Sequence, residues 1–199
     1  MDNKSPFFQE LSKSKHVTLI GPLLKALPQI ENETLLIALA GRRDWLLKSS
    51  HAFLSIGDAD SAINKEFDIK LKKTKDRSDL FHALVLLKNP LYLKLYGFYG
   101  ARFDHQLANL GELLHFLQSN KTEITYYDQD NLPLMQLRAK GNWKFEYRGL
   151  FSIMTPLHCQ MKIDGEVKYP YNKKENWGLF SSQGLSNEDK GQFKITSSQ

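Results

Sequence analysis

The stretch HAFLSIGDADS, residues 51–61, decides how the first half of the chain folds. Its apolar run ends near Gly57 and has the length and composition of a buried strand. Two aspartates, Asp58 and Asp60, follow it with one small residue between them. Gly, Asp and Ser are common in turns, so a polar turn is one interpretation. A divalent-metal site at the end of a strand is the other.

Similar apolar runs on both sides place this strand in a parallel sheet. They are VTLI (17–20), LLIALA (35–40), FDIKL (67–71) and LYLKLYG (91–97). Two helix-like segments, SDLFHALVLLK (78–88) and HQLANLGELLHFL (105–117), lie before and after the last of these runs. Ser78 or Asp76 can cap the first helix, and Asp104 stands where the second would be capped. This alternation of strands and helices is typical of an α/β domain with an open parallel sheet.

The pattern changes after about residue 120. The remaining apolar runs are short, rich in β-branched and aromatic residues, and separated by turn residues. They are EITYY (123–127), LPLMQLR (132–138), WKFEY (143–147), LFSIM (150–154), CQMKI (159–163) and EVKYPY (166–171). The pair Asp164-Gly165 indicates a hairpin between the last two runs. We therefore predict an α/β domain in residues 1–120 and a small all-β, sandwich-like domain in residues 121–199.

The net charge, the cysteine content and the length of the apolar runs exclude several classes of protein. The formal net charge of +5 favours anionic partners, but no nucleic-acid-binding motif accompanies it, so we expect no nucleic-acid partner. The single cysteine, Cys159, excludes an intramolecular disulfide and a cysteine-rich zinc site. No run approaches the roughly 20 apolar residues of a membrane span, and the N-terminus has no continuous apolar segment typical of a signal peptide. We expect a cytoplasmic protein without a membrane partner.

Acidic residues follow three of the predicted strands. Asp58 and Asp60 come after the strand that ends near Gly57, Asp76 and Asp79 after the next one, and Asp104 after the strand that ends near residue 97. In an open parallel sheet, ligands bind beyond the carboxyl ends of the strands. Two carboxylates about 5 Å apart repel each other by roughly 3 kcal/mol at an effective dielectric constant of about 20. A bound cation relieves this repulsion, and carboxylate oxygens favour Mg²⁺ or Mn²⁺ over zinc.

Basic residues lie beside the same acids. Lys75 precedes Asp76, and Arg102 and His105 flank Asp104. Acidic and basic groups around a metal ion suit phosphoryl transfer, in which the metal and the basic groups neutralise phosphate charge. Neither GxxxxGK[ST] nor GxGxxG occurs in the sequence. A phosphate site at this edge would therefore differ from a Walker-type loop.

Four segments together resemble the motifs of the thiamine pyrophosphokinase family. They are GDADS (57–61), KDRSDLFHAL (75–84), GFYGARFDHQLAN (97–109) and GLSNE (184–188). In that family the corresponding segments run approximately GDFDS, KDxTDxxxAL, GxxGGRxDHxLAN and a late SN pair, in the same order. The resemblance implies an enzyme that transfers a pyrophosphoryl group from ATP to the hydroxyethyl oxygen of thiamine, giving thiamine diphosphate and AMP. It also implies a homodimer with its active sites between the subunits.

The resemblance further implies roles for individual residues. Asp58, Asp60 and Asp79 would bind Mg²⁺ and the ATP phosphates, and together with Asp104 they would form the catalytic set. The residues expected to contact the nucleotide are Lys75, Asp76, Ser78, Arg102, His105 and Asn109. Ser186 and Asn187 would contact the thiamine pyrimidine. Residues 1–120 would then be the catalytic domain that binds ATP and Mg²⁺, and residues 121–199 would contribute to thiamine binding and dimerisation.

One segment departs from the family pattern. Family members usually carry an acidic-Gly-Gly stretch, approximately ADGGA, after the second strand, whereas this chain reads LAGRRDW at residues 39–45. Ala40 replaces the acid, and Arg42 adds bulk and positive charge at the second glycine. This leaves two alternatives open: a related pyrophosphokinase for another heterocyclic alcohol, such as a hydroxymethylpterin, and a non-catalytic nucleotide- or thiamine-binding protein. The retained aspartates favour catalysis, and Ala40 and Arg42 favour binding without turnover.

Overall fold

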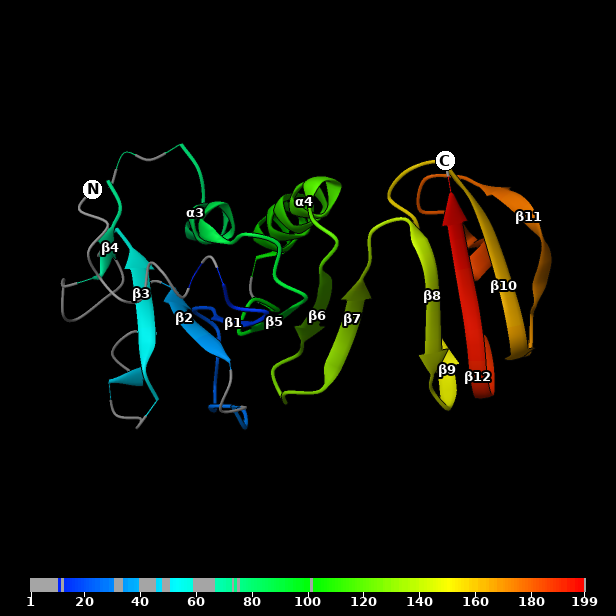
Figure 1. The fold of residues 1–199 in the computed structure, drawn as a ribbon, viewed down its shortest axis with the longest axis horizontal. Coiled ribbons are helices and arrows are strands. Elements are labelled where there is room, and N and C mark those ends of the chain that lie inside the picture. Colours follow the sequence, from blue (N-terminus) through cyan, green and yellow to red (C-terminus); the bar gives the residue numbers. More distant parts are fainter. Residues whose placement is uncertain are drawn as a thin grey trace. The chain divides into compact units, whose positions relative to one another are not determined.

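The chain forms two compact units, one ending at Ala139 and the other beginning at Lys140. The computed structural model describes residues 11, 13–30, 34–39, 46–47, 51–58, 67–72, 74, 76–100 and 102–198, with the backbone alone at Lys190. Figure 1 shows the helices and strands of both units. No helix in these described ranges is long and apolar enough to cross a membrane.

The first unit is built on a seven-stranded sheet with the strand order β4-β3-β2-β1-β5-β6-β7 (Figure 1). Its strands are β1 (His16–Ile20), β2 (Leu35–Leu39), β3 (Phe53–Gly57), β4 (Ile69–Lys70), β5 (Tyr92–Tyr96), β6 (Glu123–Tyr127) and β7 (Pro133–Leu137). All neighbouring strands are parallel except β6 and β7, which are antiparallel. The predicted α/β class with an open, mostly parallel sheet is confirmed.

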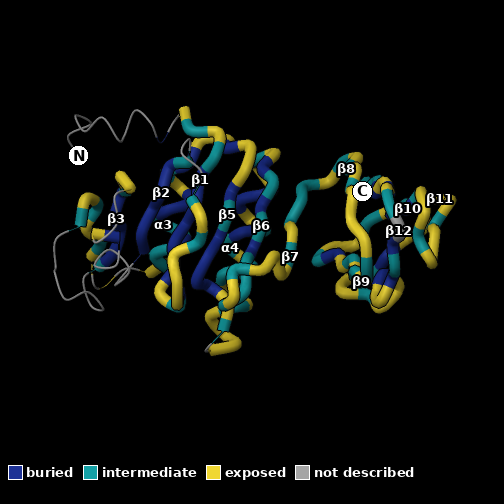
Figure 2. Tube along the Cα trace, turned by 90° about the horizontal axis from the view of Figure 1, so that it is seen from below, coloured by how far each residue is buried: buried dark blue, intermediate teal, exposed yellow. Residues whose placement is uncertain are grey.

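The central strands are largely buried on both faces, which explains their mostly apolar sequences. All five residues of β2 are buried, and Figure 2 shows the same for most of β1 and β5. Two helices, α3 (Asp79–Leu86) and α4 (Phe103–Ser119), contribute their buried residues to the larger of the two core clusters in this unit. Burial of this sheet therefore supplies most of the apolar core of the unit.

Helix α3 begins as predicted, with Ser78 as its cap. The Ser78 hydroxyl accepts a hydrogen bond from the Phe81 N–H at 3.0 Å. The same hydroxyl donates to Glu112 of α4 at 2.6 Å. One side chain therefore caps α3 and joins it to α4.

Helix α4 begins differently from the prediction. Its cap position is Arg102, whose side chain makes no capping hydrogen bond, and Asp104 lies inside the first turn. The prediction that Asp104 caps this helix is therefore wrong. A carboxylate in the first turn is still favourable, because it faces the positive end of the helix dipole.

The boundary between the units also lies elsewhere than predicted. Strands β6 and β7 pair with the first sheet, so that sheet extends to Leu137 and the boundary moves from residues 120/121 to 139/140. Both strands have the short, β-branched and aromatic composition of the strands that follow them. Composition reveals that a segment is a strand, but the choice of sheet depends on long-range pairing.

The second unit is an antiparallel sheet with the order β11-β10-β12-β8, and β9 pairs with β12. Its strands are β8 (Gly141–Glu146), β9 (Gly149–Phe151), β10 (Cys159–Val167), β11 (Tyr171–Trp177) and β12 (Asn187–Ser198). The buried core of this sheet includes Ile163, Trp177 and Phe193. The all-β prediction is confirmed, but the strands form one curled sheet (Figure 1), whereas a sandwich has two.

The predicted hairpin at Asp164-Gly165 is wrong, because both residues lie inside β10. Gly165 has a φ of 125°, and a Cβ there would lie 2.6 Å from the Gln192 carbonyl oxygen and 2.7 Å from the Phe193 Cα. The register with β12 shifts between Gly165 and Val167. The glycine therefore permits a bulge and a close approach of two strands, which an Asp-Gly pair allows as well as a turn.

Candidate functional site

The strand order marks one place in the first sheet as a ligand-binding crevice. From β1 the chain builds outward through β2, β3 and β4, and then returns to β5 on the other side of β1 (Figure 1). The order therefore reverses between β1 and β5. In open α/β sheets, ligands bind outside the carboxyl ends of the strands at such a switch point.

A pocket of about 110 Å³ lies at that point. It is lined by residues that follow β1 and β5 and by the first turns of α4. They are Pro22, Leu23, Gly97, Phe98, Gly100, Arg102, His105 and Asn109. Three residues predicted to contact a nucleotide, Arg102, His105 and Asn109, are therefore brought together here.

The loops after β1 and β5 touch through their backbones. The Gly21 N–H donates to the Tyr96 carbonyl at 2.7 Å, and the Leu23 N–H donates to the Gly97 carbonyl at 2.8 Å. Gly97 has a φ of 76°, and a Cβ there would lie 2.5 Å from the Leu24 nitrogen and 2.7 Å from the Gly21 oxygen. Only glycine fits a position with this conformation and this space.

The loop that follows β5 is held by three different elements. The Gly97 carbonyl accepts from Leu23, after β1. The Phe98 carbonyl accepts from the Tyr126 hydroxyl of β6 at 2.8 Å, and the Gly100 carbonyl accepts from Gln106 Nε2 of α4 at 3.3 Å. Within the described part of the chain, the N–H groups of residues 98–100 donate to no acceptor. Three carbonyls of the loop, those of Gly97, Phe98 and Gly100, are therefore engaged, whereas the N–H groups of residues 98–100 have no acceptor among the described residues.

Arg102 and Asp104 form an ion pair at the edge of the pocket. Arg102 Nε donates to Asp104 Oδ1 at 3.1 Å, and Arg102 Nη2 contacts Asp104 Oδ2. Both side chains are largely exposed. The hydrogen bond between them raises the pKa of Arg102 and lowers the pKa of Asp104. Because a carboxylate with a lowered pKa is a weaker base, this geometry suits orientation of the arginine better than proton abstraction.

Three further predicted acids lie at the same edge of the sheet, beyond β3 and β4. Asp58 directly follows β3 and is half-buried, and Asp79 is the half-buried first residue of α3. Asp76 is exposed just before that helix. Asp60 and Lys75 lie outside the described residues. Among the residues that are described, no three His, Cys, Asp or Glu side chains lie close enough to hold a metal ion together.

The acids and the pocket are separated along the edge. Strand β3 is two positions from β1 in the sheet, and neighbouring strands lie about 4.8 Å apart, so the separation is roughly 10 Å. Strand β2 lies between them and ends at Leu39. The residues after it that depart from the family pattern, Ala40 and Arg42, lie outside the described ranges.

Some predicted ligand contacts have partners inside the protein. The Ser78 hydroxyl is used by the α3 cap and by Glu112. The Asn109 side chain lies close enough to the Tyr126 hydroxyl to lower its pKa. These contacts give both residues a structural role, and their predicted contacts with a nucleotide stay predictions.

The predicted thiamine contacts, Ser186 and Asn187, belong to the second unit. Asn187 is only 1% exposed, and its Nδ2 donates to the Tyr169 carbonyl at 2.9 Å. Its Oδ1 accepts from the N–H groups of Tyr169 at 3.0 Å and Glu188 at 2.9 Å. Ser186 is exposed, and its N–H donates to the Ser152 hydroxyl at 3.1 Å. Of the pair, only Ser186 presents its side chain to solvent.

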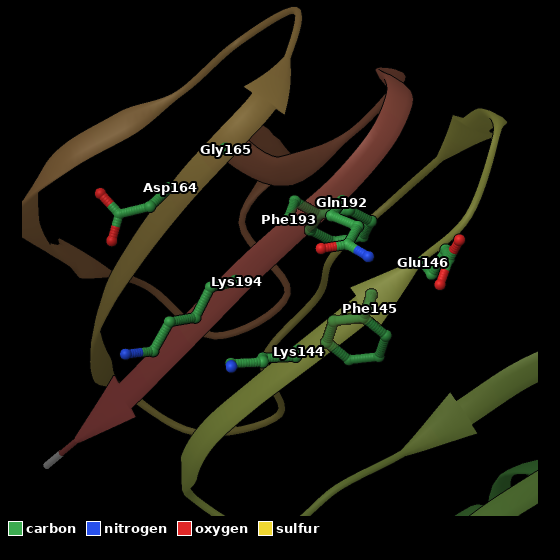
Figure 3. A pocket seen from close by; sticks show the side chains of 8 residues that line it. All are labelled: Lys144, Phe145, Glu146, Asp164, Gly165, Gln192, Phe193 and Lys194. Carbon is green, nitrogen blue, oxygen red and sulfur yellow. The ribbon is translucent and has the colours of Figure 1, made fainter.

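A second concavity, of about 480 Å³, lies in the β unit (Figure 3). It is lined by Lys144, Phe145, Glu146, Asp164, Gly165, Gln192, Phe193 and Lys194. Lys144 and Lys194 are paired across β8 and β12, and Asp164 forms an ion pair with Lys162 at 2.9 Å. No residue predicted to bind a ligand lines this concavity, and its charges are mixed. We therefore assign the candidate site to the edge of the first sheet.

Several residues of the site carry no clear signal in the sequence. Leu23 and Phe98 line the pocket as ordinary apolar residues, and Tyr126 resembles any aromatic strand residue. The Gly-Pro pair at residues 21–22, directly after β1, indicates a turn at the pocket. Contacts such as Tyr126 with Phe98 join residues far apart in the sequence, so only the fold reveals them.

Solved structures of known proteins match both units, whereas no family model and no curated protein sequence matches the chain. The thiamine pyrophosphokinase from Bacillus subtilis is 21% identical with a TM-score of 0.72, covering 92% of this chain and 94% of that one. The enzyme from Geobacillus thermodenitrificans is 18% identical with a TM-score of 0.66, covering 92% and 93%. The thiamin pyrophosphokinase from Candida albicans is 12% identical with a TM-score of 0.65, covering 96% and 88%.

These matches agree with the resemblance drawn from the four sequence motifs. They extend over nearly the whole chain and therefore include the sheet of the first unit and the curled sheet of the second. At these low identities the agreement concerns the fold. The chain has the fold of the thiamine pyrophosphokinases.

Proposed function

We propose that this protein is a Mg²⁺-dependent thiamine pyrophosphokinase, which transfers the pyrophosphoryl group of ATP to thiamine and releases AMP. The observation that carries the proposal is the match of 92% of the chain to the Bacillus subtilis enzyme at a TM-score of 0.72. The pocket at the switch point supports it, because Arg102, His105 and Asn109 meet there. These residues belong to the motif GFYGARFDHQLAN that first suggested the family.

The loop after β5 and the start of α4 suit the phosphates of ATP. The available N–H groups of residues 98–100 are donors, and the positive end of the α4 dipole lies beside them. Arg102 adds a guanidinium, which matches phosphate geometry with two donors. Asp104 orients this guanidinium through their ion pair. We propose that these groups bind phosphate oxygens.

The acids beyond β3 and β4 suit a magnesium ion. Mg²⁺ prefers oxygen ligands, keeps several waters, and is commonly held by one or two carboxylates together with substrate phosphates. Asp58 and Asp79 are the described carboxylates that fit this role, and Asp60 is the third predicted ligand. When bound, the ion would neutralise charge on the transferring phosphates. The separation of roughly 10 Å from the pocket leaves room for a phosphate chain along the edge.

The β unit offers a surface for thiamine and for a second subunit. Met154, Leu179, Phe180 and Leu185 are large apolar side chains that are each 44–56% exposed. Their segments lie side by side, because the Phe180 N–H donates to the Thr155 carbonyl at 2.8 Å and the Ile153 N–H to the Gly184 carbonyl at 2.9 Å. Exposed apolar groups of this kind mark interaction surfaces. They support the proposed homodimer, in which Ser186 would contact thiamine.

The proposed function is tested with purified protein, ATP, Mg²⁺ and thiamine, by measuring AMP and thiamine diphosphate. We expect both products, and we expect Asp58→Asn to abolish them. Asp164→Asn is the matched control, because it removes a carboxylate from the surface of the β unit and should leave the rate unchanged. Formation of AMP with a hydroxymethylpterin and not with thiamine would instead identify a related pyrophosphokinase. Saturable nucleotide binding without turnover on either alcohol would identify a binding protein.

The residues after β2 that differ from the family pattern, Ala40 and Arg42, can be tested separately. If the loss of the acid and the gain of Arg42 weaken catalysis, the double variant Ala40→Asp/Arg42→Gly should turn over thiamine faster than the wild type. A lower rate in this variant would show that the chain uses its own loop sequence productively. The comparison requires only the same product assay.

A further inference from the structure

One buried hydroxyl connects the pocket to the body of the first sheet. Tyr126, in β6, is 4% exposed, and its hydroxyl donates to the Phe98 carbonyl at 2.8 Å. The two rings also pack against each other, with centroids 6.4 Å apart. Phe98 lines the pocket, whereas Tyr126 is not among its lining residues. Tyr126 therefore supports the pocket through its contact with Phe98, without lining the pocket itself.

The same hydroxyl also reaches α4. The side chain of Asn109, which lines the pocket as well, lies close enough to this hydroxyl to lower its pKa. A single oxygen thus joins the loop after β5, helix α4 and strand β6. These are two of the walls of the pocket and one strand of the sheet, so the hydroxyl fixes the position of the walls relative to each other.

We propose that Tyr126 is a positioning residue for nucleotide binding, and that Asn109 contributes to the site through Tyr126 and not by contacting the ligand. The proposal rests on the proposed function, because it takes the pocket between β1 and β5 to be the nucleotide site. The Tyr126 hydroxyl binds the Phe98 carbonyl on the side of the sheet, and the loop then presents its N–H groups to phosphate oxygens.

The protonation state of Tyr126 fits a fixed donor. Burial raises the pKa of this phenol to about 12, and the Asn109 side chain opposes the shift only in part. The hydroxyl therefore keeps its proton throughout the neutral range and donates to Phe98 continuously. A group that never releases its proton can position a loop, but it cannot serve as a base.

The next residue in the strand provides a matched control. Tyr127 follows Tyr126 in β6, and its ring stacks on that of Tyr96, a member of the second core cluster, with a centroid distance of 4.1 Å. Tyr126 belongs to the larger core cluster and Tyr127 packs against the smaller one, so the two phenols lie in different parts of the core. Tyr127→Phe removes the same atom as Tyr126→Phe from the same strand without touching Phe98.

The test measures ATP affinity by isothermal titration calorimetry for the wild type and both variants, together with kcat and KM. We expect Tyr126→Phe to weaken ATP binding about fivefold or more, which is the effect of losing one hydrogen bond that shapes the site. The KM for thiamine should stay within twofold, and Tyr127→Phe should stay within twofold of the wild type throughout. Equal ATP affinities in the two variants would overturn the proposal.

A double-mutant cycle tests the part played by Asn109. If Asn109 acts through Tyr126, then Asn109→Ala should weaken ATP binding no further when Tyr126 is already phenylalanine. Multiplying effects would instead assign Asn109 a contact of its own and overturn that part of the proposal. Since binding needs no turnover, a wild type that binds ATP but forms no thiamine diphosphate would refute the proposed function alone. A wild type that binds no ATP would refute both.

Discussion

Replacing Gly97 with alanine tests the close contact between the loops after β1 and β5. Gly97 has a φ of 76°, and a Cβ there would lie 2.5 Å from the Leu24 nitrogen and 2.7 Å from the Gly21 oxygen. Both neighbouring atoms belong to the backbone, so no side chain can rotate away. Gly97→Ala should therefore force the two loops apart and destabilise the first unit.

The expected size of the effect follows from two contributions. A left-handed conformation costs an L-amino acid about 1–2 kcal/mol. Separation of the loops also weakens the hydrogen bond from the Leu23 N–H to the Gly97 carbonyl, now 2.8 Å long, which is worth about 1 kcal/mol. The free energy of unfolding should then fall by roughly 2–3 kcal/mol. For a chain of this size, that lowers Tm by roughly 4–12 °C.

Gly111→Ala is the matched control for this measurement. Gly111 lies in the middle of α4, and nothing lies within 4 Å of an added Cβ. Alanine is the better helix former, so this variant should be more stable than the wild type by about 0.5–1 kcal/mol. Urea unfolding followed by circular dichroism gives the midpoint and slope for all three proteins. Replacement of glycine by alanine should thus lower the free energy of unfolding at Gly97 and raise it at Gly111.

Two results would refute this reasoning. One is a Gly97→Ala protein that melts within 2 °C of the wild type, because the loops would then accept a side chain. The other is a Gly111→Ala protein that loses as much stability as Gly97→Ala, because the effect would then come from alanine at any glycine. Either result would remove the close backbone contact as the explanation for Gly97.

Ser78→Ala should lower the free energy of unfolding by about 1–2 kcal/mol in urea titrations, because the cap of α3 and the bond to Glu112 are both lost. Ser119→Ala, at the exposed end of α4, should change it little, and equal losses would contradict the assigned cap. Arg102→Gln should leave the urea midpoint unchanged, because the ion pair is exposed, and should raise the pKa of Asp104 in an NMR titration. Since the pKa of Asp104 is lowered in the folded protein, the ion pair is intact above the usual aspartate range and is lost as pH falls through the lowered value. An unchanged Asp104 titration in the variant would contradict the pairing.

The sequence alone predicted the parts of the fold that depend on local pattern. The runs at β1, β2, β3 and β5 are mostly apolar because both faces of a central parallel strand are buried, so they could be recognised without the structure. The Ser78 cap follows from hydrogen bonding within one turn. The placement of acids beyond the strands followed from the same reasoning, and together with the motifs it indicated the family whose fold the chain has.

Features that depend on contacts between residues far apart in the sequence could be found only from the tertiary structure. Strands β6 and β7 have the composition of the β unit, but β6 pairs with β5 and β7 pairs with β6, which places both in the first sheet. Asp164-Gly165 satisfies a hairpin as well as a bulge, and the neighbouring β12 determines which one forms. The Asn187 side chain forms hydrogen bonds with the Tyr169 backbone, 18 residues away, and the Tyr126 hydroxyl donates to the Phe98 carbonyl across 28 residues. The local sequence pattern indicates which residues are buried and where turns can form. Several long-range pairings are compatible with the same local pattern, and the assembled sheet determines which of them forms.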